Sequence, residues 1–180
     1  MVKKAITHLK LDQANPGKLE KLDALAAEYQ RVVQANVDWL IAHEERQPNK
    51  YANIPEQEIP TSLSDRWQRC AWQQACGIVR SWYSHERENP PILRHPCIQA
   101  NTNVVVIEPS NTPQFDFWLR ISTLDAGRPV RIPIKFYDRA RETLAQFSRL
   151  CSGVTLNQRE GAWLLPSWWS AKGQSFPRHR

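Results

Sequence analysis

The four cysteines are the residues that could most readily form a metal site, so their spacing matters first. A structural zinc site favours close ligand pairs, because two ligands on one turn hold half of the tetrahedron in place. Cys70 and Cys76 are six residues apart, about 120° around a helix, and Cys97 and Cys151 stand alone. We therefore expect no metal site and interpret the thiols as small core or surface residues.

The histidines and carboxylates likewise lack the spacing of a catalytic centre. The five histidines lie in no recognisable arrangement with Ser or Cys, and no glycine-rich phosphate loop is present. Two-metal nuclease chemistry needs several converging acidic groups, but Asp116 is the only carboxylate at an interior position of an expected strand. The sequence predicts a protein that is not an enzyme, with no cofactor and no small-molecule substrate.

Arginines on an expected helix from Asp65 to about Arg87 give the strongest functional signal. One side of this helix is apolar, and the opposite side carries a narrow stripe of arginines: Arg66, Arg69, Arg80 and Arg87. Four arginines in line over roughly 30 Å of helix favour a track for phosphates. A solvated basic face would give the same pattern.

Net charge supports a polyanionic partner. The chain has 24 Lys and Arg against 18 Asp and Glu, with a net charge of +6 and a pI near 9.4. Further basic candidates lie on expected strands: Lys3, Lys4, Lys10, Arg131 and Lys135. Three aromatic residues could stack on bases if they are exposed: Trp72, Tyr83 and Trp118. Core packing is the alternative for each aromatic residue, and it is stronger for Trp67 and Trp82 than for Trp72.

These residues need a scaffold, and the hydrophobic patterns predict one of α+β class. Residues 2–11 alternate as a strand, residues 18–46 form an amphipathic helix, and 47–63 read as a loop. Beyond the second helix the sequence predicts strands at 103–108, 115–121 and 130–136, a helix at 138–150 and a hairpin ending at Leu165. Because Pro133 lacks an N–H group, its strand should lie at an edge or carry a bulge.

The expected organisation has four parts. Residues 1–12 give the first strand of a β element, and 18–88 form a two-helix recognition part with loop 47–63. Residues 97–165 complete a small antiparallel β-barrel or meander, and 166–180 form an irregular tail. No apolar run approaches the roughly 20 residues that cross a bilayer, so we expect a cytoplasmic protein with reduced cysteines.

Asn36 is the one polar residue within the apolar face of the first helix. An unpartnered buried Asn costs roughly 1–3 kcal/mol, so a partner is expected. The amide either bonds neighbouring backbone or the second helix, or it is tolerated at a helix contact that fixes register alone.

The order of these elements resembles a known family. A strand in KKAITHLKL precedes a helix with Tyr, six residues and then Asn, in YQRVVQANVDWL. A second helix, LSDRWQRCAWQQACGIVRSW, leads to FDFWLRI, RPVRIPIKF and a VTLNQREGAWLL hairpin. This resembles the N-terminal portion of OrfB-type (TnpB-like) transposon-encoded proteins, which are RNA-guided DNA endonucleases related to type V CRISPR effectors.

The resemblance implies a wedge-like β part and a recognition lobe that contact guide RNA and duplex DNA. In that family the hairpin is followed by a RuvC-like nuclease domain and a CxxC…CxxC zinc ribbon, and neither pattern is present here. We therefore expect a truncated transposase-type nuclease that binds but does not cut, with residues after Leu165 read out of frame. The alternatives are a stand-alone nucleic-acid-binding regulator of a mobile element and a decayed, non-functional gene product.

Overall fold

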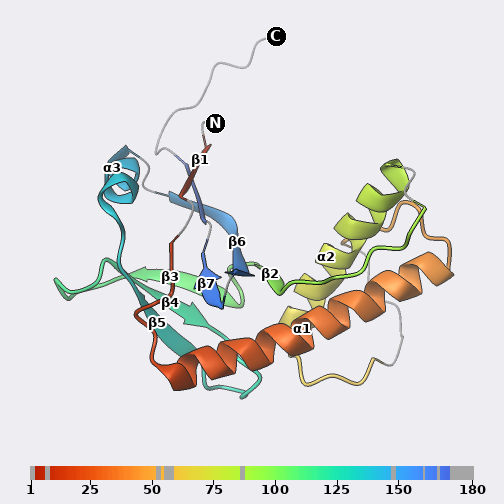
Figure 1. The fold of residues 1–180 in the computed structure, drawn as a ribbon, viewed down its shortest axis with the longest axis horizontal. Helices are drawn as coiled ribbons and strands as arrows, with labels where there is room; N and C mark the ends of the chain where they lie inside the picture. The colour runs from red at the N-terminus through yellow and green to blue at the C-terminus, as the bar shows by residue number, and fades with distance from the viewer. Residues whose placement is uncertain are drawn as a thin grey trace, which may run out of the picture.

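The computed structural model describes residues 3–6, 9–51, 54, 59–85, 88–146, 149–159, 161–165 and 167–170. Helix α1 (Pro16–Ala42) runs along the length of the molecule, and α2 (Asp65–Ser84) packs on one half of it. Two antiparallel sheets lie over the other half (Figure 1). The expected α+β class with antiparallel strands is confirmed, and both long helices lie between the first and second strands in the sequence.

Helix α1 begins earlier than the amphipathic pattern indicates. The Asn15 side chain accepts a hydrogen bond from the Lys18 amide at 3.0 Å, and Pro16 takes the first helical position, where its missing N–H does no harm. Asn-Pro-Gly, which reads as a turn in the sequence, is therefore a helix start. The helix ends at Ala42, before the expected boundary, and Glu44 follows with a positive φ of 53°.

Strands β3 (Val105–Pro109), β4 (Phe117–Ile121) and β5 (Val130–Ile134) form a three-stranded antiparallel meander. Its inner face carries alternate apolar residues, among them Ile107, Leu119 and Ile132, which lie in register. Pro133 lies in β5, an edge strand of this sheet, so the edge placement expected for it is confirmed. Strand β3 begins two residues later than expected, because the Asn101 side chain accepts the Asn103 amide and forms a turn there.

The second sheet has five strands and is built around β6 (Arg149–Arg159). Strand β6 pairs with β2 (Cys97–Ala100), β7 (Ala162–Leu164) and β8 (Ser167–Ser170), and β8 also pairs with β1 (Lys3–Ile6). The expected hairpin is present as β6 and β7, with Gly161 at a φ of 75° in its turn. A short helix, α3 (Asp138–Gln146), connects the two sheets.

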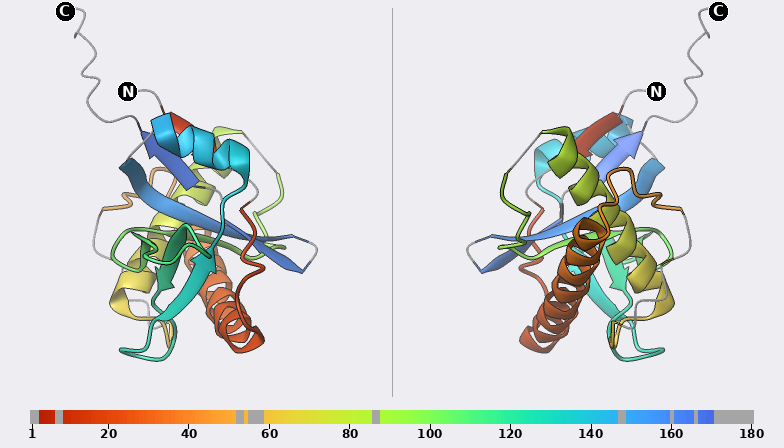
Figure 2. Two further views of the ribbon diagram at one scale, coloured as in Figure 1. Left: turned by 90° about the vertical axis from the view of Figure 1, so that its left-hand side faces the viewer. Right: turned by 90° about the vertical axis from the view of Figure 1, so that its right-hand side faces the viewer.

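Two expectations about the β part need correction. The strands form two separate sheets, not one closed barrel (Figure 2). The segment after Leu165 was expected to be irregular, but Ser167–Ser170 adds strand β8 between β1 and β6. Its sequence, SWWS, is rich in tryptophan, which favours extended backbone. The remaining tail, 171–180, lies outside the described residues.

One hydrophobic core runs through the helices and the sheets. Its largest fully buried side chains include Trp67 of α2 and Tyr29 of α1, whose rings meet edge to face at 5.6 Å. From the sheets, Ile98, Leu119 and Ile132 belong to the same cluster. The core therefore fixes the position of α2, and with it the arginine stripe, relative to the strands.

Candidate nucleic-acid interface

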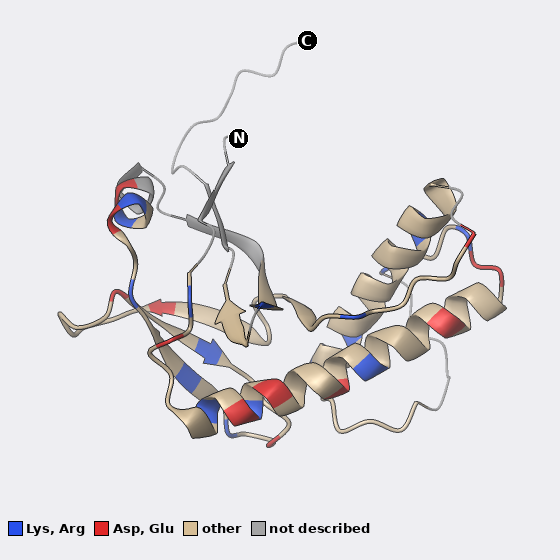
Figure 3. Cartoon of the chain, viewed as in Figure 1, with Lys and Arg blue, Asp and Glu red and all other residues tan. Residues whose placement is uncertain are grey.

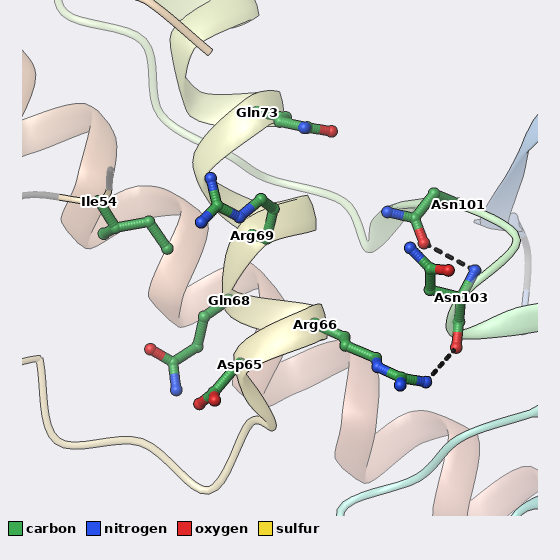
Figure 4. A pocket seen from close by; sticks show the side chains of 8 residues that line it. All are labelled: Ile54, Asp65, Arg66, Gln68, Arg69, Gln73, Asn101 and Asn103. Carbon is green, nitrogen blue, oxygen red and sulfur yellow. Dashed lines mark hydrogen bonds between the residues drawn. The ribbon is translucent and has the colours of Figure 1, made fainter. Parts of the chain in front are cut away.

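A polar pocket of about 640 Å³ lies between α2 and the loop that connects β2 to β3. It combines two arginines of the stripe with four amide side chains, one carboxylate and one isoleucine: Arg66, Arg69, Gln68, Gln73, Asn101, Asn103, Asp65 and Ile54. Figure 4 shows these side chains on both sides of the pocket. The structure thus brings part of the expected phosphate track next to groups that could read a base edge.

Arg66 joins the helix to the loop. Its guanidinium donates a hydrogen bond of 3.5 Å to the Asn103 carbonyl (Figure 4). The loop is itself held in shape, because the Asn101 side chain accepts the Asn103 amide at 2.9 Å and its carbonyl accepts the amides of Val104 and Val105. The exposed Arg66 side chain therefore lies over a fixed turn.

The other stripe residues differ in their surroundings. Arg69 is half-buried and lines the same pocket. Arg80 is half-buried two turns beyond Gln73, where its Nε donates to the Cys76 carbonyl of its own helix at 3.3 Å. Within the described part of the chain, neither Arg66 nor Arg80 forms a salt bridge. Arg87 lies outside the described residues.

The basic residues expected on strands do not line this pocket. Arg131 of β5 pairs with Glu108 of β3, which also pairs with Arg120 of β4 at 3.1 Å. The hydrogen bond from Arg131 is the main reason that the pKa of Glu108 lies below its usual value. One carboxylate thus compensates part of the charge of two arginines on this sheet face, and Figure 3 shows basic segments on the strands as well as on the helices.

The remaining lysine candidates are only partly described. Lys135 is exposed just after β5, and Lys10 is exposed where it bridges to Leu164. The side chains of Lys3 and Lys4 lie outside the described residues.

One of the three candidate stacking residues is wrong for that role. Trp72 is buried, and its indole N–H donates to the Asn49 carbonyl at 3.4 Å. Trp118 is half-buried against Phe115, and Tyr83 is half-buried between Trp82 and Arg46. Trp67 and Trp82 were expected to be more buried than Trp72. This is correct for Trp67, which is fully buried, but wrong for Trp82, which is half-exposed while Trp72 is in the core.

Asn36 is buried as the helical wheel predicts, at 2% exposure. Its amide donates to the Val32 carbonyl one turn earlier in the same helix, at 3.0 Å. Of the alternatives left open by the sequence, a bond to neighbouring backbone is therefore present.

Burial of the thiols disfavours their charged, thiolate form. Burial raises the pKa of Cys70 and Cys97, and it raises the pKa of Cys76 to about 11. At neutral pH these three side chains are protonated, whereas attack and metal binding use the thiolate. Among the described residues, no group of three or more His, Cys, Asp or Glu is placed to hold a metal ion. Cys151 lies outside the described side chains.

The sequence pattern indicates Arg66 and Arg69 as site residues but not the residues that face them. Asn101 and Asn103 read as the end of a loop and the start of a strand, and Ile54 falls in a loop with little periodicity. The Asn-Thr-Asn pattern is a turn signal that could have marked the loop. The pairing of this loop with α2 depends on long-range packing, which the pattern does not carry.

No described helix has both the length and the apolar character needed to cross a membrane. The scan against protein-family models finds no match to this chain, and the search of curated proteins finds no match either.

Proposed function

We propose that the protein binds RNA through α2, as the recognition lobe of a TnpB-like protein that holds guide RNA and contacts duplex DNA without cutting it. The observation that carries this proposal is the pocket in which Arg66 and Arg69 lie beside the amides of Gln73, Asn101 and Asn103. The proposed site of action is the cytoplasm, and the proposed activity is binding alone.

Charge and geometry support this proposal together. Arg66, Arg69 and Arg80 follow one stripe of α2, and the guanidinium group forms charge-assisted hydrogen bonds with phosphate oxygens. Arg66 and Arg80 are not neutralised by a carboxylate within the described chain, unlike Arg131 and Arg120 on the sheet. Arg66 and Arg80 therefore offer a phosphate guanidinium groups that form no salt bridge within the described chain, whereas Arg120 and Arg131 share the Glu108 carboxylate.

The test is a salt titration of RNA affinity. A fluorescent 20-base-pair RNA duplex is titrated with the full chain at several salt concentrations, and the same is done with an Arg66→Ala, Arg69→Ala, Arg80→Ala variant. Affinity falls as salt rises, and each lost phosphate contact makes the plot of log affinity against log salt less steep by about one. For the triple variant we expect the magnitude of this slope to decrease by roughly two to three and the RNA affinity to fall about tenfold or more. The same titration with a DNA duplex of the same sequence compares the affinity for RNA with the affinity for DNA.

A charge-matched control separates this site from general basicity. Lys18→Ala, Arg94→Ala and Arg128→Ala also remove three positive charges, from α1 and from two loops outside the α2 pocket. This variant should retain most of the affinity and slope. Equal losses in both variants, or no loss in the α2 variant, would exclude α2 as the phosphate track.

A further inference from the structure

The α2 pocket differs from a simple phosphate track in its amide content. A track needs only cations, yet four of the eight lining side chains are amides: Gln68, Gln73, Asn101 and Asn103. An amide offers a donor and an acceptor side by side, which is the pattern needed to bond a base edge. The volume of about 640 Å³ falls within the range of about 300–1,000 Å³ that is typical of small-ligand pockets.

We propose that this pocket holds a single unpaired RNA nucleotide, with its phosphate on the Arg66 and Arg69 guanidinium groups and its base edge against the amides. The inference rests on the proposed function, since it names the substrate of that same site. The arginines and amides come from two elements, α2 and the β2–β3 loop, so the nucleotide would lie between them (Figure 4).

The amides differ in how much of their bonding capacity is already used. The Gln68 amide group donates to the Leu63 carbonyl at 2.9 Å, and the Asn101 oxygen accepts the Asn103 amide. Both residues therefore shape the pocket walls. The two remaining amides are Gln73, which is half-buried on the helix, and Asn103, which is exposed on the loop. We assign these two side chains to the base.

An unpaired nucleotide fits this arrangement better than a continuous duplex does. In an A-form duplex the major groove is deep and narrow, so side chains do not reach the base edges there. A bulged nucleotide leaves the stack and exposes both its base edge and its phosphate. Ile54 adds an apolar surface, and a guanidinium plane can also stack on a base.

The experiment compares three RNA probes with the full chain by fluorescence anisotropy. One is a flush 20-base-pair duplex, the second carries one bulged adenosine, and the third carries an abasic site in place of that bulge. Adenosine is chosen because an amide side chain matches its donor–acceptor edge. We expect the adenosine bulge to bind about five- to tenfold more tightly than the flush duplex, and the abasic probe to lose that gain.

Two double variants locate the effect. Gln73→Ala with Asn103→Ala should remove the preference for the bulge, so that the bulged and the flush probes bind this variant with equal affinity. Gln47→Ala with Asn111→Ala removes the same residue types from exposed sites outside the pocket and should leave the preference intact.

The outcomes distinguish this inference from the proposed function. Binding of the flush duplex without any gain from the bulge would overturn the nucleotide pocket and leave RNA binding by α2 standing. A bulge preference that survives Gln73→Ala with Asn103→Ala would also overturn it, because the base would then be read elsewhere. Failure to bind any probe would overturn the proposed function itself.

Discussion

At the scale of single residues, Gln74 acts in place of a neighbouring strand at the open edge of β2. Its amide group donates to the Cys97 carbonyl at 3.2 Å, and its oxygen accepts the Gln99 amide at 3.3 Å. The Tyr29 hydroxyl donates to the same oxygen, at 2.9 Å. An unpaired strand edge needs such partners when it is buried, so one side chain joins α2, α1 and the sheet.

Replacing Gln74 by leucine should therefore be costly. The substitution leaves the part-buried Cys97 carbonyl and Gln99 amide without this partner, and a polar group left unsatisfied away from water costs about 1–3 kcal/mol. We expect a loss of about 2–4 kcal/mol in the free energy of unfolding, measured in urea by tryptophan fluorescence. Gln73→Leu, one position away on the half-exposed side, is the control and should change stability by less than about 0.5 kcal/mol. Similar losses for both variants would contradict the role given to Gln74.

Sequence patterns could reveal part of this residue-scale organisation. Asn36 stands out because it interrupts an apolar face, and the structure confirms its burial. Gln74 carries the same signal, since it lies seven residues after Trp67 and therefore on the same helix face. The partners Cys97 and Gln99 could not be predicted, because they belong to a four-residue strand whose pairing depends on distant segments.

At the scale of elements, a hydrogen-bonded clamp ties α1 to the segment that leads into α2. The Glu28 carboxylate accepts from the Thr61 hydroxyl at 2.6 Å and from the Ser62 amide at 3.2 Å. Arg31 pairs with Glu28 at 2.8 Å and donates to the Pro60 carbonyl at 2.6 Å. These bonds lower the pKa of Glu28 from 4.5 to about 2, with the Arg31 hydrogen bond as the largest cause.

This clamp predicts a pH dependence with a definite sign. Because the pKa of Glu28 is lower in the folded state, its contribution is fully present above about pH 4.5 and is lost as the pH falls towards 2. Glu28→Gln should cost about 1–3 kcal/mol at pH 7, and the difference from the unsubstituted protein should shrink between pH 4.5 and 2. Urea unfolding at pH 7, 4 and 3 measures this. Glu20→Gln, at an exposed site on the same helix, should show a difference within about 0.5 kcal/mol at each pH.

Elements were easier to predict than their boundaries and pairings. Periodicity located α1 and α2, but the true start of α1 depends on the cap formed by Asn15. The alternating apolar pattern predicts β4 and β5, whereas β2 and β8 lie in segments without a clear alternation. The pocket then combines residues from position 54 to position 103, so its composition follows from packing that local patterns do not encode.

At the scale of the whole molecule, α1 connects parts that are distant in the sequence. Lys21 pairs with Asp125 in the loop between β4 and β5 at 2.8 Å. Asp23 accepts from the indole of Trp163 in β7 at 2.7 Å. Gln34 exchanges hydrogen bonds with the backbone of Pro91 and Leu93, in the segment before β2. One helix therefore contacts both sheets as well as the segment that enters the second sheet.

This arrangement predicts that helices and sheets unfold as one cooperative unit. Leu25 is fully buried on α1 and belongs to the core cluster that continues into both sheets. Leu25→Ala should cost about 2–5 kcal/mol, and the loss should appear equally in the helical circular dichroism signal and in hydrogen exchange of the β4 amides. Ala24→Gly tests the helix alone, since Ala24 is exposed on α1 and the change costs only about 1 kcal/mol. If Leu25→Ala lowered the helical transition and left β4 protection unchanged, the molecule would consist of two independent units, and the α2 pocket would no longer be held against a fixed sheet.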